Sequence, residues 1–293
     1  GAQSDMTKLS IRHRTTYSYR YPVLLAPHRL TIRPRESHDL LLVSHDIHVF
    51  PAATLNWSTD VFGNSIAMAT FAEPTANLAI DSAAVVDLRA ANWPVFNIAA
   101  SAITYPFFYE QNAWKDLGAL RDQQYPDRFK TLDRWARGFV GGYGTDTLSL
   151  LKDISAGIAN QHMYLSREAE GTQTPVETLT MRSGTCRDFA VLFAEAVRLL
   201  GFGARIVSGY LHNPTRMLTG SGDSGTTHAW VDVFLPGAGW ITFDPTNRSM
   251  GGANLIPVAV ARDIAQTTPI SGGFTGATDA FLAMNVAVDV VEL

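Results

Sequence analysis

The chain contains a single cysteine, Cys186, whose position in the sequence suits a nucleophile. It lies in RSGTCRDFAVLFAEAVRLLGFG, where the segment TCRD matches the capping pattern that precedes many helices. Thr185 is then the N-cap residue, Cys186 the first helical residue and Asp188 the third. A helix N-terminus carries partial positive charge and unpaired backbone N–H groups, which stabilise a thiolate and can stabilise an oxyanion. The alternative is that Cys186 is a small core residue, as many lone cysteines are.

A thiol nucleophile requires a base and a group that orients the base. His228 begins the segment HAWVDVF, and Asp244 ends GWITFD. Together with Cys186 they could supply the nucleophile, base and orienting carboxylate of acyl transfer. Taken singly, a histidine on a strand or an aspartate before proline has an ordinary structural explanation.

The turn sequence PGAG joins these two segments and predicts a hairpin. If the hairpin pairs Leu235 with Trp240, Asp244 lies opposite Val231. That position is three residues, or about 10 Å of strand, away from His228. We therefore expect a bulge, an irregular loop or a strong twist to bring the two side chains together.

The elements that position these residues fall into an α+β pattern. Alternation with a period of two from residue 9 to about 90, with frequent turn signals, predicts an N-terminal antiparallel β-sandwich. Helices are expected over 127–140, 147–162 and 186–200, and strands over 204–211, 228–235, 240–244 and 285–293. This divides the chain into an N-terminal β region (6–100), an α+β core (101–265) and a C-terminal segment with a final strand (266–293). The Gly-rich stretch 212–227 is expected to be a mobile loop that borders the site.

Composition and charge exclude several classes of protein. The net charge of −4, without a basic block, gives no indication of nucleic-acid binding. No apolar run approaches the roughly 18 residues of a membrane span, and the N-terminus has no signal-peptide hydrophobic segment. We therefore expect a cytoplasmic protein. His45 and His48 lack further ligands at useful spacing, so neither a metal nor another cofactor is expected.

Four motifs occur in order and resemble the transglutaminase-like superfamily of papain-type cysteine enzymes. They are R-x-G-x-C-x-D-x-A at 182–190, R-x-V-x-G-Y at 205–210, H-A-W at 228–230 and G-W-x-x-x-D-P-T at 239–246. The resemblance implies that Cys186 is the nucleophile, His228 the general base and Asp244 the residue that orients it. It also implies a papain-like core, in which the cysteine helix packs on an antiparallel sheet. The N-terminal β region is similar, more loosely, to the region that precedes this core in bacterial members.

Three further residues are candidates for the site. A second oxyanion donor, beside the backbone N–H of Cys186, could come from Tyr164 or Gln161, although Tyr164 could also simply pack against the site. Trp230 shares a strand face with His228 and could form a wall of the cleft or belong to the core.

The leading hypothesis is a cysteine-dependent enzyme that cleaves peptide or amide bonds through a thioester acyl-enzyme. Its substrate would be a peptide, a protein or a small amide, and water would be the acyl acceptor, because no residue indicates the dry channel that an amine acceptor needs. A protein-glutamine transglutaminase is the first alternative. A non-catalytic binding module on the same fold is the second, and the presence of all three residues argues against it.

Overall fold

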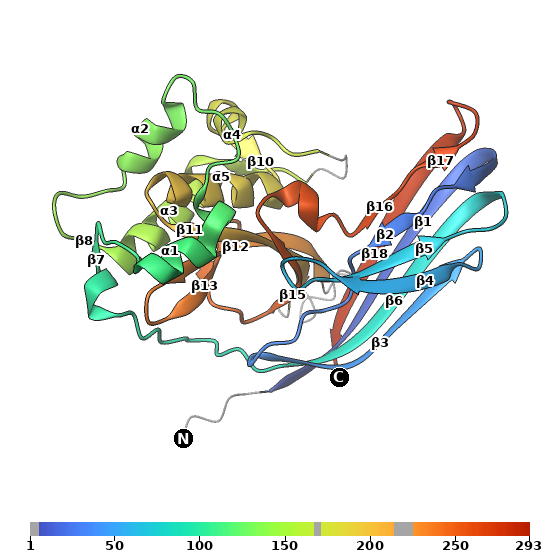
Figure 1. The fold of residues 1–293 in the computed structure, drawn as a ribbon, viewed down its shortest axis with the longest axis horizontal. Helices are drawn as coiled ribbons and strands as arrows, with labels where there is room; N and C mark the ends of the chain where they lie inside the picture. The colour runs from blue at the N-terminus through green and yellow to red at the C-terminus, as the bar shows by residue number, and fades with distance from the viewer. Residues whose placement is uncertain (1–5, 167–170, 214–224) are drawn as a thin grey trace.

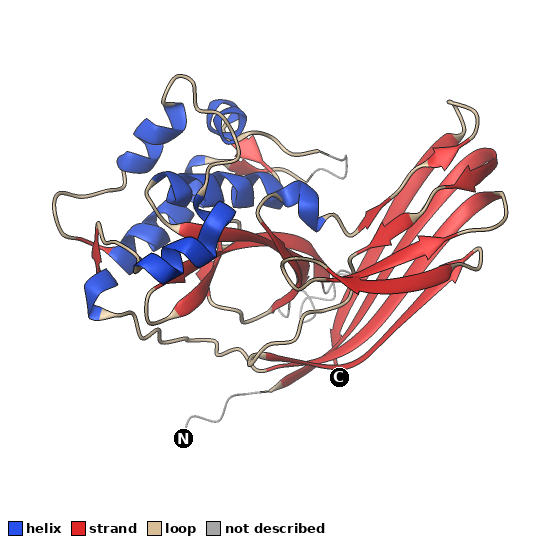
Figure 2. Cartoon of the chain, in the orientation of Figure 1, coloured by secondary structure: helices blue, strands red, loops and turns tan. Residues whose placement is uncertain are grey.

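A computed structural model describes residues 6–166, 171–213 and 225–293, arranged as a β-rich region beside a mixed core (Figure 1). Helices gather over one sheet of the core, whereas the N-terminal region consists of strands (Figure 2). The predicted α+β class with an N-terminal antiparallel β region is confirmed.

The larger N-terminal sheet is antiparallel and contains both ends of the described chain. Its order is β17-β1-β6-β3, and β18 also pairs with β1. The strands are β1 (Thr7–Leu25), β3 (Leu40–Phe50), β6 (Thr75–Leu88), β17 (Phe274–Thr275) and β18 (Phe281–Glu292). The last strand therefore adds to the N-terminal sheet and not to the core sheet, although it comes after the core in the sequence.

A second antiparallel sheet packs against the first to form the sandwich. Its order is β16-β2-β5-β4. The strands are β2 (His28–Leu30), β4 (Thr54–Thr59), β5 (Ser65–Thr70) and β16 (Ile270–Ser271). Alternate residues of β1 and β6, such as Val23 and Ile80, bury their side chains against Leu30 and Ala67 of this sheet. This arrangement is the half-buried, period-two pattern expected of a sandwich.

The core sheet carries the strands that the sequence placed around His228 and Asp244. Its antiparallel order is β14-β13-β12-β11-β15. The strands are β11 (Gly203–His212), β12 (Gly225–Leu235), β13 (Gly239–Asp244), β14 (Ser249–Met250) and β15 (Leu255–Ala261). Helix α5 (Cys186–Leu199) lies on this sheet and buries Phe189, Phe193 and Val197 against Val231 and Val233 of β12.

Among the described residues, four other α-helices belong to the core, and three of them contact α5. The four are α1 (Gln111–Leu117), α2 (Thr131–Arg137), α3 (Thr147–Gln161) and α4 (Pro175–Met181), with 3₁₀ turns at Ala100–Ala102, Gly118–Arg121 and Ile264–Thr267. Short strands pair as β7 (Thr104–Tyr105) with β8 (Thr145–Asp146), and as β9 (Met163–Tyr164) with β10 (Ser183–Gly184). None of the described helices has the length and apolar character of a membrane span.

The helix predicted over 127–140 is shorter in the structure, where α2 begins at Thr131. The Asp127 carboxylate accepts hydrogen bonds from the backbone N–H groups of Leu132 and Asp133, at 3.1 and 2.9 Å. Lys130, directly before the helix, has a φ of 58°. Residues 127–130 therefore precede the helix and cap its N-terminus. The apolar spacing over 127–140 could not show where the helix begins.

Candidate functional site

Cys186 is the first residue of α5 and is partly exposed, as the capping pattern predicts. The Thr185 side chain accepts a hydrogen bond from the backbone N–H of Asp188, and the Asp188 carboxylate accepts one from the backbone N–H of Thr185. This reciprocal capping box fixes where the helix begins. The thiol therefore sits at the positive end of the helix.

Asp188 also holds the backbone near the cysteine turn, which is the segment 183–185 that leads into α5. It is completely buried, and its Oδ1 accepts a hydrogen bond of 2.7 Å from the backbone N–H of Gln173. The Gln173 amide in turn donates to the carbonyl of Ser183 at 2.9 Å. A Cβ at Gly184 would lie 2.8 Å from Cβ of Asp188, so only glycine fits there. Gln173 was not predicted from the sequence, because nothing in its local pattern indicates this long-range contact.

His228 and Asp244 lie on neighbouring strands, β12 and β13, and their side chains meet. Nε2 of His228 is 2.8 Å from Oδ2 of Asp244, and both residues are buried. The expected register, Leu235 opposite Trp240, is wrong by one residue, since Leu235 pairs with Gly239.

This shift changes which face of the sheet carries Asp244. In the observed register Val231 pairs with Phe243, so continuation of the ladder sets Asp244 opposite Trp230. Because side chains alternate along a strand, Asp244 then shares a face with His228, two residues along β12. Such diagonal neighbours are within reach of long side chains. The ladder of β12 and β13 thus brings the pair together with no bulge in it. The bulge, irregular loop or strong twist was expected only because the register expected from the sequence was off by one residue.

The turn between β12 and β13 sets this register. Three residues, 236–238, separate the paired ends, and the N–H of Ala238 donates to the carbonyl of Leu235 at 3.2 Å. Pro236 occupies the second turn position and Gly237, with a φ of 82°, the third. Proline followed by a residue of positive φ defines a type II turn. Gly239, with a φ of 75°, then begins β13.

The Asp244 carboxylate is held by the turn that follows it. Oδ1 accepts hydrogen bonds from the backbone N–H groups of Thr246 and Asn247, at 3.1 and 3.4 Å. The Asn247 amide donates to Oδ2 at 2.8 Å and lies 3.5 Å from Nε2 of His228. Asn247 is therefore a member of the site that sequence analysis missed. The signal was the D-P-T-N sequence, which is typical of an Asx turn.

The surroundings of His228 favour its charged form. Burial alone lowers the pKa of His228, but hydrogen bonds with Asp244 and Cys186 and the negative charge of both groups outweigh burial and raise that pKa from 6.5 to about 10. Because Nε2 is bonded to Asp244, Nδ1 is the ring nitrogen left for the cysteine. The arrangement can therefore hold an imidazolium between a thiolate and a carboxylate.

The structure places the three other candidates differently. Tyr164 is beside the cysteine turn: it pairs with Gly184 across β9 and β10, contacts Phe189 edge-on and is 50% exposed. Gln161, at the end of α3, accepts a hydrogen bond from the indole of Trp135 at 2.9 Å. Trp230 is only 2% exposed and packs among core residues beside the His228 ring, so it supports the imidazole from within the core and is no open wall of a cleft.

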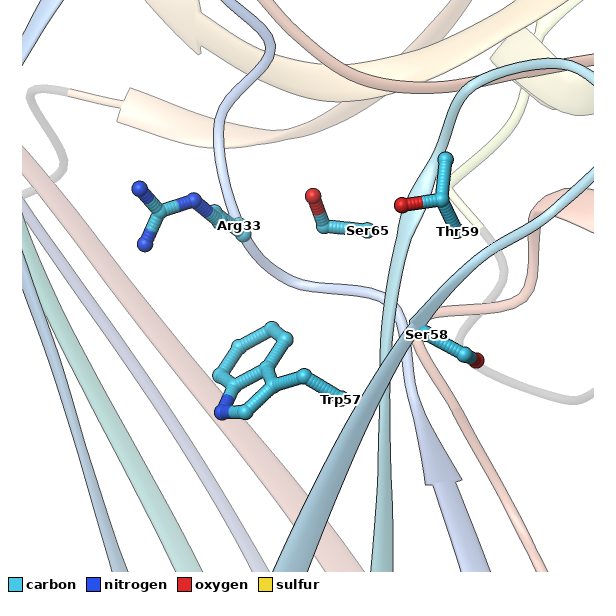
Figure 3. A pocket seen from close by; sticks show the side chains of 5 residues that line it. All are labelled: Arg33, Trp57, Ser58, Thr59 and Ser65. Atoms are coloured by element: carbon cyan, nitrogen blue, oxygen red, sulfur yellow. The ribbon is translucent and has the colours of Figure 1, made fainter.

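Two other features lie away from these contacts. Of the loop expected over 212–227, the ends belong to β11 and β12, and 214–224 lie outside the described residues. A hollow of about 360 Å³ on the N-terminal region is lined by Arg33, Trp57, Ser58, Thr59 and Ser65 (Figure 3). None of these residues belongs to α5, β12 or β13, so this hollow is separate from the candidate site.

The N-terminal region and the core each match a known protein family. Residues 133–245 match the transglutaminase-like superfamily, and residues 9–87 match the bacterial transglutaminase-like N-terminal region. An uncharacterized protein of Mycobacterium leprae is 23% identical over 307 residues, covering 98% of this chain and 100% of its own. A protein-glutamine gamma-glutamyltransferase of Pseudomonas aeruginosa is 39% identical over 70 residues, which are 22% of this chain and 10% of that protein.

Among solved structures, a candidate cysteine protease from Cytophaga hutchinsonii superposes with a TM-score of 0.74. The two chains are 21% identical, and the match covers 99% of this chain and 92% of the other, so they share the whole fold. The chain thus contains a transglutaminase-like superfamily core at residues 133–245, preceded by a bacterial transglutaminase-like N-terminal region at residues 9–87.

Proposed function

We propose that this protein is a cysteine-dependent acyl-transfer enzyme that cleaves peptide or amide bonds. The observation that supports this proposal most directly is the hydrogen-bonded chain from Cys186 through His228 to Asp244. Its substrate is a peptide, a protein or a small amide. The role of each of the three residues follows from its position.

In the first step, the Cys186 thiolate attacks the carbonyl carbon and forms a C–S bond. The C–N bond then breaks, and the leaving nitrogen takes a proton from the His228 imidazolium. A thioester acyl-enzyme and a neutral imidazole remain. Asp244 accepts a hydrogen bond from Nε2 throughout, so it keeps the ring oriented and stabilises its charged form.

The tetrahedral intermediate carries an oxyanion that needs hydrogen-bond donors. The capping box uses the backbone N–H groups of Thr185 and Asp188, which leaves the N–H of Cys186 for this purpose. For the second donor we favour Tyr164 over Gln161. Tyr164 lies on the strand that pairs beside Gly184, next to the start of α5, whereas the hydrogen bond from Trp135 to the Gln161 carbonyl oxygen holds that side chain toward α2.

Water is the acceptor that we favour for the second step. The neutral His228 takes a proton from water, the hydroxide attacks the thioester, and the Cys186 thiolate leaves. Cys186 is partly exposed and Tyr164 is half exposed, so water reaches the acyl-enzyme. Transfer to an amine is the second candidate, and the local similarity to the Pseudomonas gamma-glutamyltransferase favours it. A non-catalytic module would have no need for the buried His228–Asp244 pair.

Intact-mass spectrometry after exposure to peptides and small amides tests the proposal. Because the chain has only one cysteine, a thioester adduct identifies Cys186 directly. We expect a transient adduct and the free acid in the wild type, and neither in Cys186→Ala. With a small primary amine present, an excess of the amine adduct over the free acid would make the protein a transglutaminase. Turnover that persists in Cys186→Ala would show that the nucleophile is wrongly assigned.

A further inference from the structure

A second hollow, of about 440 Å³, lies between helices α2, α3 and α4, on the side of the core that holds the cysteine turn. It is lined by Thr131, Trp135, Gln161, His162, Leu179 and Arg182. The lining combines one cation, the neutral polar side chains of Thr131, Gln161 and His162, and apolar surface, and it contains no carboxylate. Such a combination of apolar walls and a few directed polar groups is typical of a ligand site.

The neutral polar groups of the hollow have defined orientations. The Trp135 indole donates to the carbonyl oxygen of the Gln161 side chain at 2.9 Å, so the amide N–H groups of Gln161 remain as donors. Burial lowers the pKa of His162, and its Nδ1 is 2.9 Å from the carbonyl of Ile158. His162 is therefore neutral, with Nδ1 as the donor, and Arg182 carries the only full charge in the lining.

Arg182 projects from a fixed backbone. Its N–H donates to the carbonyl of Thr178 and its carbonyl accepts from the N–H of Met163, both at 2.9 Å. Its φ of 53° is uncommon for a residue with a side chain. Among the described residues, no carboxylate forms an ion pair with the guanidinium of Arg182. The hollow thus presents an unpaired cation beside the amide donors of Gln161.

The hollow is close to the nucleophile. Arg182 precedes Cys186 by four residues, so their Cα atoms are at most about 14 Å apart. Aromatic contacts connect the two places, since the ring of Phe189, one turn into α5, is 6.0 Å from the ring of His162 and 6.1 Å from that of Tyr164. An extended peptide covers this separation in about four residues.

We propose that this hollow is a substrate subsite that binds the carboxylate side chain of an Asp or Glu, about four residues or fewer from the carbonyl that Cys186 attacks. The inference rests on the proposed function and names its substrate class, an acidic peptide. The planar guanidinium matches the two oxygens of a carboxylate, and the Gln161 amide adds a neutral donor. Trp135 and Leu179 supply apolar surface for the methylene groups.

Binding of short fluorescent peptides to the Cys186→Ala protein tests the subsite. In each peptide a single Glu stands at a different position of an otherwise uncharged sequence, and a twin peptide carries Gln at that position. We expect one position, or two adjacent ones, at which the Glu peptide binds about fivefold more tightly than its Gln twin. Arg182→Gln should remove this preference, and Arg182→Lys should restore part of it.

Arg134→Gln is the matched control, because Arg134 is exposed on α2 and does not line the hollow. It should keep the preference for Glu. Equal binding of Glu and Gln peptides at every position would overturn the subsite, as would an equal loss in Arg134→Gln and Arg182→Gln. The measurement needs no acyl transfer. Peptides that bind in this way but never acylate the wild-type protein would therefore overturn the proposed function and not the subsite.

Discussion

His228 and Asp244 are diagonal neighbours on adjacent strands, and their side chains meet at 2.8 Å between Nε2 and Oδ2. The register of β12 and β13 places both on one face of the sheet, and the Asx turn after Asp244 holds the carboxylate toward the ring. Asn247 donates to the same oxygen that His228 contacts. The carboxylate is therefore fixed before any substrate binds, which is the condition for an effective orienting group.

Asp244→Asn should lower the rate of acylation by about 10²–10⁴-fold, provided that the protein acts as proposed. The amide keeps the shape of the carboxylate but removes its charge, so the pKa of His228 should fall from about 10 toward its ordinary value. Single-turnover kinetics with a peptide substrate measure the rate, and an NMR titration of the His228 ring measures the pKa.

Asp232→Asn is the control for this change. Asp232 is a buried carboxylate on the same strand, but it binds Arg205 and Thr242 and not the histidine. The variant should keep both the acylation rate and the pKa of His228. A His228 pKa that is the same in Asp244→Asn as in the wild type would show that the carboxylate does not support the imidazolium.

The position of Cys186 could be predicted from the sequence because its signals are local. A capping box needs only the residues Thr185 to Asp188, and the apolar spacing that follows predicts the helix. The alternation in β1 likewise predicted a strand with one buried face. Local signals failed where a side chain outside an element decides its end, as Asp127 does for α2.

The relation between His228 and Asp244 could not be derived from the sequence in the same way. A shift of one residue in the hairpin moves Asp244 to the other face of the sheet, and the shift depends on positive φ angles at Gly237 and Gly239. Contacts between distant segments, such as that of Gln173 with Asp188, leave no periodic trace in the sequence. These contacts require the folded chain.

Stability should depend on pH through His228. Its pKa is raised from 6.5 to about 10 on folding, so the folded state binds the proton more tightly than the unfolded state. The resulting stabilisation is complete below pH 6.5 and is lost as the pH rises through about 10. Urea unfolding between these two pH values should therefore show a decreasing contribution to the free energy of unfolding.

His228→Gln isolates the contribution of His228 and its partners, because groups that do not interact with His228 titrate equally in both proteins. The wild type should exceed the variant in free energy of unfolding by the largest margin near pH 6.5, and by a shrinking margin toward pH 10. A margin that stays constant over this range would mean that the histidine does not gain a proton on folding.

A buried amide, that of Asn64, is one of the connections between the N-terminal sandwich and the core sheet. Asn64 is 0% exposed, and its side chain donates to the carbonyl of Val260 at 2.7 Å and accepts from the N–H of the same residue at 2.9 Å. Its oxygen also accepts from Arg35, and its nitrogen donates to Asp60. Close by, Phe62 packs against the cluster that contains Trp230, two residues beyond His228. The Asn64 side chain thus connects the sandwich to the core sheet, whose strands β12 and β13 carry the site.

Asn64→Ala should therefore lower the free energy of unfolding by about 2–4 kcal/mol, because it leaves both backbone groups of Val260 buried without their partners. Asn56→Ala, which removes an exposed asparagine from the neighbouring strand β4, should change it by less than about 0.5 kcal/mol. Urea denaturation of both variants measures the difference. Equal stability of the two variants would show that water replaces the hydrogen bonds of Asn64 with Val260. The attachment of the sandwich to the core sheet would then depend on the apolar contacts of β1 with β11 and β15.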